Sequence, residues 1–409
     1  MVLHWGESEV PWDSMATILL FFRANLASST DHNGIAWISF LWYTYRDWED
    51  LKSIPLYKET RLGDQVSGSV IDDFWTLLHT MRDTNCSNPR DKVYAFLNHP
   101  SAFDLVSGKP IVLPDYTKSV EQIYCEVAIA GLESRLSAVL CSISHPFGSL
   151  LNGTLPTWVP NYVDDDRPPS IITGGFNTCL DLKPDVAISN SKTEIHLGGL
   201  VFDSIEKITN ETLSSLLLKL NQYFTGPSVA KHRRVAILQE TMDFVRMTDT
   251  KRAYPRLSVD LITTLITAMS GSAVNPEANT LVYLADFYSY SAQLPLPLST
   301  PDTRGSLTEA QVTYLASRGN ALHFEQNTLT SINRKPFCTP KGYIGLAPEI
   351  AEEGDIVCVI FGCKFPIVLR PQGDHYLLLG ACYVLGIMQG EAIEMMRNGE
   401  LEKQVFEIH

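Results

Sequence analysis

The sequence predicts an α+β fold, in which a mainly helical N-terminal subdomain precedes a small C-terminal β-barrel-like module with a helical insertion. Three observations support this. Residues 1–135 read mainly as helices and loops, residues 193–205 alternate as a strand does, and residues 356–385 hold four short apolar runs separated by turn residues. We therefore expect the strand near residue 200 and those near residue 360 to close one β module, although the chain between them is largely helical.

The clearest helix of the N-terminal part begins after Ser119. Ser119 followed by Gln122 is a capping-box pattern, and apolar residues then recur at helical spacing on one face, which we expect to be buried. These residues are Val120, Ile123, Tyr124, Val127 and Gly131. Earlier in the chain, the apolar run at 15–22 predicts a buried helix, and the aromatic-rich segment at 37–48 predicts a packed core.

Composition changes predict four segments. These are a mainly helical subdomain at 1–165, a linker with the first barrel strands at 166–210, a helical insertion at 211–330, and the barrel module at 331–409. Prolines and the acidic run at 164–166 favour an extended connection near the first boundary. Gly198 and Gly199 in the strand at 193–205 suggest a bulge or bend.

The insertion and the last segment have different patterns. Helical spacing recurs in the insertion at 235–247, 259–269, 280–294 and 307–317. Strand patterns follow at 356–361, 366–370, 376–379 and 382–385. Residues 371–374 form a hairpin loop between two of these runs, with Gly373 available for a positive φ.

Charge and composition exclude several partner classes. The 409 residues carry a formal net charge of -14, which repels nucleic acid, and the basic cluster at 231–234 is too short to overcome it. No apolar run reaches the roughly 18 residues of a spanning helix, and no export signal is visible, so we expect no membrane partner and a cytoplasmic protein. Eight cysteines are too few for a disulfide framework and are expected to stay reduced.

Linear motifs predict neither a metal site nor a cofactor. There is no C-x-x-C pair, and Cys358 and Cys363 have no nearby pair of histidines to complete a zinc site. The glycines between 342 and 390 match neither a P-loop nor a dinucleotide fingerprint, and no hydrolase elbow, zincin or kinase signature occurs. A pocket assembled from distant residues would leave no such trace, so catalysis stays open.

Two places in the N-terminal part offer candidate site residues. Arg90 and Asp91 could form a binding loop for a carboxylate or phosphate, although helix capping by Asp91 and an ion pair of Arg90 are the favoured explanation. Tyr116 is a further candidate binding residue. His99 could be a general base if it faced a pocket, against the favoured alternative of a histidine at the surface or at the C-terminal end of a helix.

The C-terminal part offers a second set. Asp374 and His375 are candidate catalytic residues, with Cys382 as the nucleophile of a possible triad. Adjacent residues of an extended segment point to opposite faces, and Asp374 belongs to the turn, so we favour a buried, inert Cys382. Arg370 and Glu391 are charged residues beside apolar strands and are candidate binding residues. The default expectation for each is a structural salt bridge, for instance with one another.

Several segments together resemble one family. Residues 88–100 read NPRDKVYAFLNHP, 113–128 read LPDYTKSVEQIYCEVA, and 155–162 read LPTWVPNY. In this order they resemble the motifs of the fungal heterokaryon incompatibility (HET) family, and the whole segment at 1–165 is then HET-like. Residues 339–392 resemble the closing module of the same family, with Leu385 and Gln389 where many members carry His and Asp.

The family's N-terminal effector motifs, Tyr-x-Ala-Leu-Ser-Tyr-x-Trp-Gly and Trp-Ile-Asp-x-x-Cys-Ile-Asn-Gln, do not occur in the sequence. The resemblance thus implies a recognition or regulatory portion of a non-self recognition and cell-death protein, without its effector, that binds an unknown protein partner. The alternative is a HET-like enzyme of fungal secondary metabolism, whose small-molecule ligand would be an apolar metabolite in a pocket between the helical part and the barrel. A third possibility is an incomplete gene start at Met1.

Overall fold

The computed structural model describes ten stretches of the chain, which are residues 2–5, 8–11, 73–82, 84–104, 108–145, 153–163, 176–209, 276–293, 309–328 and 334–409. The helices predicted at 235–247 and 259–269, the apolar run at 15–22, the aromatic segment at 37–48 and the basic cluster at 231–234 lie outside them. The chain divides into two compact units, one of residues 1–77 and 95–110 and the other of residues 78–94 and 111–409.

The first unit contains a short hairpin where the sequence predicted helices and loops. Strands β1 (Val2–Trp5) and β2 (Ser8–Pro11) pair antiparallel. Helix α6 (Phe74–Thr80) begins in this unit, where the Asp73 carboxylate accepts a hydrogen bond from the backbone N–H of Thr76 and caps the first turn. A short 3₁₀ turn, η1 (Pro100–Ala102), follows later in the unit.

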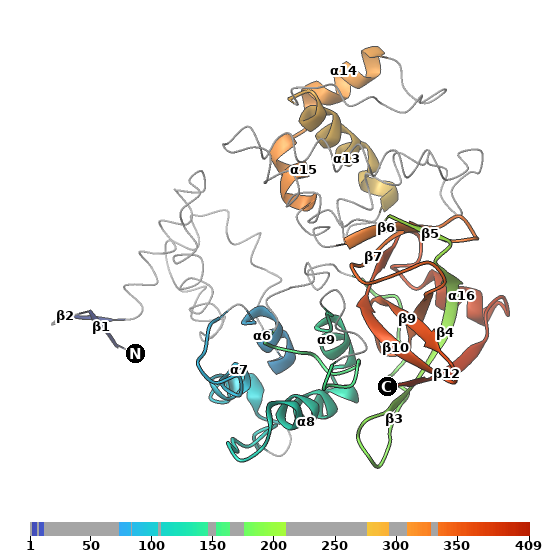
Figure 1. The fold of residues 1–409 in the computed structure, drawn as a ribbon. Coiled ribbons are helices and arrows are strands. Elements are labelled where there is room, and N and C mark those ends of the chain that lie inside the picture. The colour runs from blue at the N-terminus through green and yellow to red at the C-terminus, as the bar shows by residue number, and fades with distance from the viewer. Residues whose placement is uncertain are drawn as a thin grey trace. The chain divides into compact units, whose positions relative to one another are not determined.

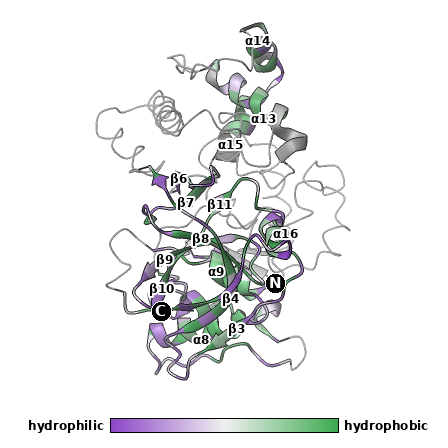
Figure 2. Ribbon diagram, turned by 90° about the vertical axis from the view of Figure 1, so that its right-hand side faces the viewer, coloured by the Kyte–Doolittle hydropathy of each residue, from purple (hydrophilic) through white to green (hydrophobic). Residues whose placement is uncertain are grey.

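The second unit starts with three helices, which are α7 (Asp91–Tyr94), α8 (Val120–Leu132) and α9 (Leu136–Cys141). The predicted capping box is confirmed, because the Ser119 hydroxyl accepts from the Gln122 N–H and the Gln122 side chain accepts from the Ser119 N–H. The predicted face is buried except at Val120, which is half-buried. Helix α9 is largely hydrophobic in Figure 2, in keeping with four buried residues among its six.

Three further helices lie in the predicted insertion, namely α13 (Pro276–Ser291), α14 (Glu309–Arg318) and α15 (Ala321–Thr328). The buried Asp286 carboxylate joins them, because it accepts the backbone N–H of Asn320 at 2.6 Å and lies 2.6 Å from Nδ1 of His323. A Cβ on Gly319 would lie 1.9 Å from the carbonyl oxygen of Ala285. Only glycine therefore allows the helices to approach so closely at this turn.

The larger sheet joins segments that are far apart in the sequence. Its strands are β3 (Val186–Ile188), β4 (Ile195–Ser204), β8 (Ile356–Ile360), β9 (Pro366–Gln372), β10 (His375–Ala381) and β12 (Lys403–Ile408). Their order is β12-β10-β9-β8-β4-β3, and β12 also pairs with β4, so the pairings return to their first strand. The register Gly199↔Ile360 confirms that the strand near residue 200 pairs with the one near residue 360. In Figure 1 the green strand β4 lies among the red C-terminal strands.

A smaller sheet and one helix complete the C-terminal region. The sheet has the order β11-β7-β6-β5, with β5 (Lys207–Ile208), β6 (Arg334–Cys338), β7 (Ile344–Pro348) and β11 (Tyr383–Val384). Helix α16 (Glu391–Arg397) precedes β12. The protein therefore mixes helices and strands, with a β-rich C-terminal region, as the sequence predicted.

Gly198 and Gly199 of β4 do not form the predicted bulge. The irregular register lies between Val201 and Asp203, beyond both glycines. A Cβ on Gly198 would lie 2.4 Å from the Asp185 carboxylate, and one on Gly199 would lie 2.6 Å from the carbonyl oxygen of Val359. The two glycines thus allow neighbouring chain segments to pack closely against β4.

The hairpin predicted at 371–374 is confirmed. Gln372 of β9 pairs with His375 of β10, which leaves Gly373 and Asp374 as a two-residue loop, and Gly373 has a φ of 66°. The turn places Asp374 and His375 at one end of the sheet. Among the described residues, no helix has the length and apolar character needed to cross a membrane.

Candidate functional site

Imidazoles and carboxylates gather at the end of β12. Phe406 and Ile408 of this strand are fully buried, so the alternate residues Glu407 and His409 project from the opposite, accessible face. Glu407 pairs directly with His196 of β4 in the antiparallel register. Because directly opposed residues of antiparallel strands share a face, the side chains of His196 and Glu407 meet.

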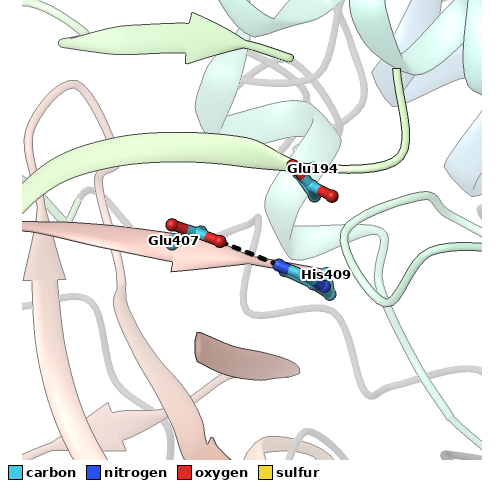
Figure 3. Close-up of side chains that lie close together, drawn as sticks. All are labelled: Glu194, Glu407 and His409. Carbon is cyan, nitrogen blue, oxygen red and sulfur yellow. Dashed lines mark hydrogen bonds and ion pairs between the residues drawn. The ribbon is translucent and has the colours of Figure 1, made fainter. Parts of the chain in front are cut away.

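The Glu407 carboxylate lies between two imidazoles. Its Oε1 is 3.1 Å from Nε2 of His409, and its Oε2 is 3.4 Å from Nε2 of His196. A Glu194 carboxylate oxygen, a Glu407 oxygen and a His409 ring nitrogen all lie within 4.8 Å of one another. Figure 3 shows Glu194 at the start of β4, beside the Glu407 and His409 pair of β12. We name these four residues, Glu194, His196, Glu407 and His409, the β12 cluster.

A second histidine and carboxylate pair adjoins the β12 cluster. The ring of His375 stacks on that of His409, with centroids 4.1 Å apart and planes 20° apart. Nδ1 of His375 is 3.1 Å from the Asp374 carboxylate. The hydrogen bond with His409 and the nearby His196 lower the pKa of Glu407, and the hydrogen bond with His375 lowers the pKa of Asp374. Both carboxylates are therefore ionised at neutral pH.

Backbone contacts hold His409 in place. Its N–H donates to the carbonyl oxygen of Tyr376, and its own carbonyl oxygen accepts from both the N–H and the hydroxyl of Thr157. The Thr157 hydroxyl oxygen in turn accepts the N–H of Leu378 on β10. The loop that carries Thr157 thus fixes the end of β12 against β10.

The half-buried His145 extends this network. Its Nε2 lies 3.2 Å from the carbonyl oxygen of Thr157 and 2.9 Å from that of Leu378. Because both partners are acceptors, Nε2 carries the ring proton. Burial lowers the pKa of His145 below its ordinary value of 6.5, so the native protein holds this ring neutral.

The lowered pKa of His145 should make the stability of the protein depend on pH. Between the lowered native pKa and 6.5, the unfolded chain binds a proton that the native chain does not, so stability falls as the pH drops through this window. We expect the wild-type protein to lose up to about 1.4 kcal/mol per pH unit there relative to a His145→Gln variant. Urea unfolding of both proteins at several values from about pH 8 to about pH 5 measures the difference. A difference that does not change with pH would contradict the assignment.

The residues of the suggested triad are not brought together. Asp374 and His375 do contact each other, because Asp374 lies in the tight turn, as the sequence predicted, and not in the strand. Cys382 follows the far end of β10, roughly 20 Å away at the usual rise per residue. Burial raises the pKa of its thiol to about 12, so it is no nucleophile at neutral pH.

The Arg90 and Asp91 loop is engaged in internal contacts. Nε of Arg90 donates to the carbonyl oxygen of Lys118 at 2.8 Å, and the Asp91 carboxylate accepts from the Tyr116 hydroxyl at 2.6 Å. That hydrogen bond raises the pKa of Tyr116. Lys92 is buried and donates to the carbonyl oxygens of Arg82 and Thr84. These contacts tie the start of α7 to the segment that precedes α8 and to the residues that follow α6.

The predicted ion pair between Arg370 and Glu391 does not form. Arg370 instead makes a bidentate pair with Asp355, from Nε at 2.9 Å and from a terminal nitrogen at 3.0 Å. Glu391 lies in the first turn of α16, where its carboxylate accepts the N–H of Gln389. Glu391 therefore supports the helix start, which favours negative charge.

His99 is buried instead of lying at the surface. It precedes η1, and its Nδ1 accepts the N–H of Ser101 and lies 2.7 Å from the Ser101 hydroxyl. Nδ1 is thus occupied by capping the turn. This arrangement gives His99 a structural role.

The β12 cluster was missed by reasoning from the sequence. Its two segments lie more than 200 residues apart in the sequence, and no linear motif joins residues 194–196 to 407–409. The available signal was the alternation of apolar and polar residues in both strands, Ile-His-Leu at 195–197 and Phe-Glu-Ile-His at 406–409. The pairing of these two strands could not be predicted from that alternation alone.

Comparison with known proteins supports the family resemblance. Residues 313–401 match the model of the Het-6 beta-barrel domain. Over 62 residues the chain is 44% identical to "heterokaryon incompatibility protein 6, OR allele" of Neurospora crassa, a match that covers 14% of this chain and 9% of that protein. No solved structure matches.

Proposed function

Because the chain carries a domain of the heterokaryon incompatibility family, we propose that it is a recognition or regulatory portion of a fungal non-self recognition protein. In this proposal it acts in the cytoplasm, binds a protein partner and performs no chemical turnover. The death-inducing segment then lies outside these 409 residues. The single observation that carries the proposal is the match of residues 313–401 to the Het-6 beta-barrel domain.

Two structural observations support a binding role. The pairings of β4, β8, β9, β10 and β12 return to their first strand, which suits a small rigid barrel as a platform. Two of the groups considered for catalysis serve the fold instead. His99 caps a turn, and Cys382 is buried with a high pKa.

All eight cysteines are free, which suits a reducing compartment.

We place the partner surface on α14. Tyr314 is 60% exposed, and the guanidinium of Arg318 lies over its ring, 5.5 Å from the centroid. Exposed tyrosine and arginine dominate the binding energy of many protein interfaces. The pair also lies at the beginning of the segment that matches the family.

A cell-fusion experiment tests the proposal. We expect deletion of the gene to abolish the death of fused cells between strains of unlike genotype, and reintroduction of this chain within its full-length gene to restore it. A Tyr314→Ala, Arg318→Ala variant should weaken partner binding by about tenfold or more and lower the fraction of dead fused cells, because two interface anchors are lost. Vital-dye staining of fused compartments measures that fraction.

Ser317→Ala is the matched control, because Ser317 is exposed on the same helix and bonds only to the nearby carbonyl oxygen of Tyr314. This variant should behave as the wild type does. Unchanged death in the deletion strain, or steady turnover of a small molecule by the purified chain, would overturn the proposal. The latter result would establish an enzyme of small-molecule metabolism instead.

A further inference from the structure

We propose that the β12 cluster is a binding site for a divalent transition metal ion, with zinc as the expected ion. Glu194, Glu407 and His409 supply three ligands, and His196 or a water molecule supplies the fourth. The site is independent of the partner surface on α14. Reasoning from cysteine spacing did not reveal it, because it contains no cysteine and is assembled from two distant segments.

The separation of the donor atoms suits a metal centre. Zinc binds imidazole nitrogen and carboxylate oxygen at about 2.0–2.2 Å, which places neighbouring ligand atoms of a tetrahedron about 3.4 Å apart. The atoms of Glu407 and His409 are 3.1 Å apart, and the three donors of Glu194, Glu407 and His409 lie within 4.8 Å of one another. Rotation of half-exposed side-chain tips by about 1 Å closes the remaining gap.

The backbone beneath the site is held firmly. Glu407 and His196 are opposed across paired strands, and the next residues inward, Phe406 and Ile408, are fully buried. His409 is fixed through both its backbone N–H and its carbonyl oxygen. A metal site depends on such support, because ligands that are already in place lose little conformational entropy on binding.

The chemistry of the donors selects the kind of ion. Two carboxylates carry a double negative charge, which a divalent cation neutralises. Imidazole ligands favour zinc, copper or nickel over magnesium and calcium, which prefer oxygen ligands alone. The ring of His375, with Asp374 bonded to its Nδ1, stacks on the His409 ring and limits its orientation.

The test uses the untagged chain with Cys86, the exposed cysteine, replaced by serine, so that thiols do not take up zinc. After treatment with a chelator, calorimetric titration with zinc chloride should show one ion per chain, and zinc should raise the unfolding temperature. Titration with magnesium chloride should show no comparable binding. Cobalt in place of zinc should give the visible absorption of a tetrahedral complex that contains imidazole.

Variants separate this site from adventitious binding. Glu407→Gln and Glu194→Gln should each lower zinc affinity by about tenfold or more. The matched control is Glu402→Gln, because Glu402 is exposed just before β12 and lies outside the cluster. The unfolding temperature without metal shows that each variant folds. No saturable zinc binding, or binding that the Glu407 and Glu194 variants leave unchanged, would overturn the proposal.

Discussion

Replacement of Trp158 by alanine is expected to lower the free energy of unfolding by about 3–5 kcal/mol, the usual cost of deleting a large aromatic ring from a core. Trp158 is fully buried and is the largest of the fully buried side chains among the described residues. Its Nε1 donates to the carbonyl oxygen of Thr193, just before β4. Alanine would leave a cavity and an unpaired carbonyl oxygen.

The loss of stability should extend beyond the cavity, because Thr157, the residue before Trp158, holds two strands. Thr157 binds the end of β12 through His409 and binds β10 through Leu378, so the loop at 153–163 joins both strands. Urea unfolding measures the change, with Trp158→Phe as the control that keeps much of the ring volume. We expect the control to lose clearly less than the alanine variant. Equal losses would show that the cavity is not the cause, and a loss under about 1 kcal/mol would contradict the tight packing.

The segment around Trp158 shows which structural features the sequence predicted and which it did not. The segment LPTWVPNY resembles a family motif and has the proline content of a connection at a domain boundary. In the structure Pro156 to Tyr162 includes five buried residues and helps to hold the β-rich region together. Proline content predicted an irregular backbone correctly, but it did not indicate burial. The apolar Trp158 and Val159 between the prolines carried that signal.

Local chemistry was predictable where a few neighbouring residues decide it. The capping box at Ser119 and the turn at Gly373 depend on side-chain and backbone preferences within four residues. The pairing of β4 with β8 was also predictable, because residues 193–205 alternate as a strand does, residues 356–361 form a short apolar run, and few other strands were available. The register of this pairing could not be predicted. The predicted bulge at Gly198 and Gly199 therefore differs from the observed irregularity near Val201.

Contacts between distant side chains were not predictable. The sequence showed that Arg370 needs a partner, but Glu391 and Asp355 were equally plausible without the course of the loop after β7. The same limit hid the β12 cluster, whose histidines and glutamates meet only because β12 returns beside β4. Charge pairing in a folded chain follows from topology, so residue type alone gives candidates without selecting among them.

Removal of the Asp355 carboxylate should have the other large effect. Asp355 is 3% exposed, receives both hydrogen bonds of the Arg370 fork, and also accepts the backbone N–H of Glu352. We expect Asp355→Ala to lower the free energy of unfolding by about 3 kcal/mol, near the lower end for a broken buried pair, because Arg370 remains 25% exposed and can be partly solvated. Urea unfolding measures the change.

Glu352→Gln is the matched control for the Asp355 variant. The Glu352 carboxylate lies 3.5 Å from Arg370 but is 69% exposed, so its loss should cost less than about 1 kcal/mol. A cycle with Arg370→Met separates the pair from the rest of the site: the double variant should be more stable than the sum of the single losses predicts, because neither charge is then left without its partner. Strictly additive losses, or equal effects of Asp355→Ala and Glu352→Gln, would show that the Asp355 and Arg370 pair does not secure the loop between β7 and β8.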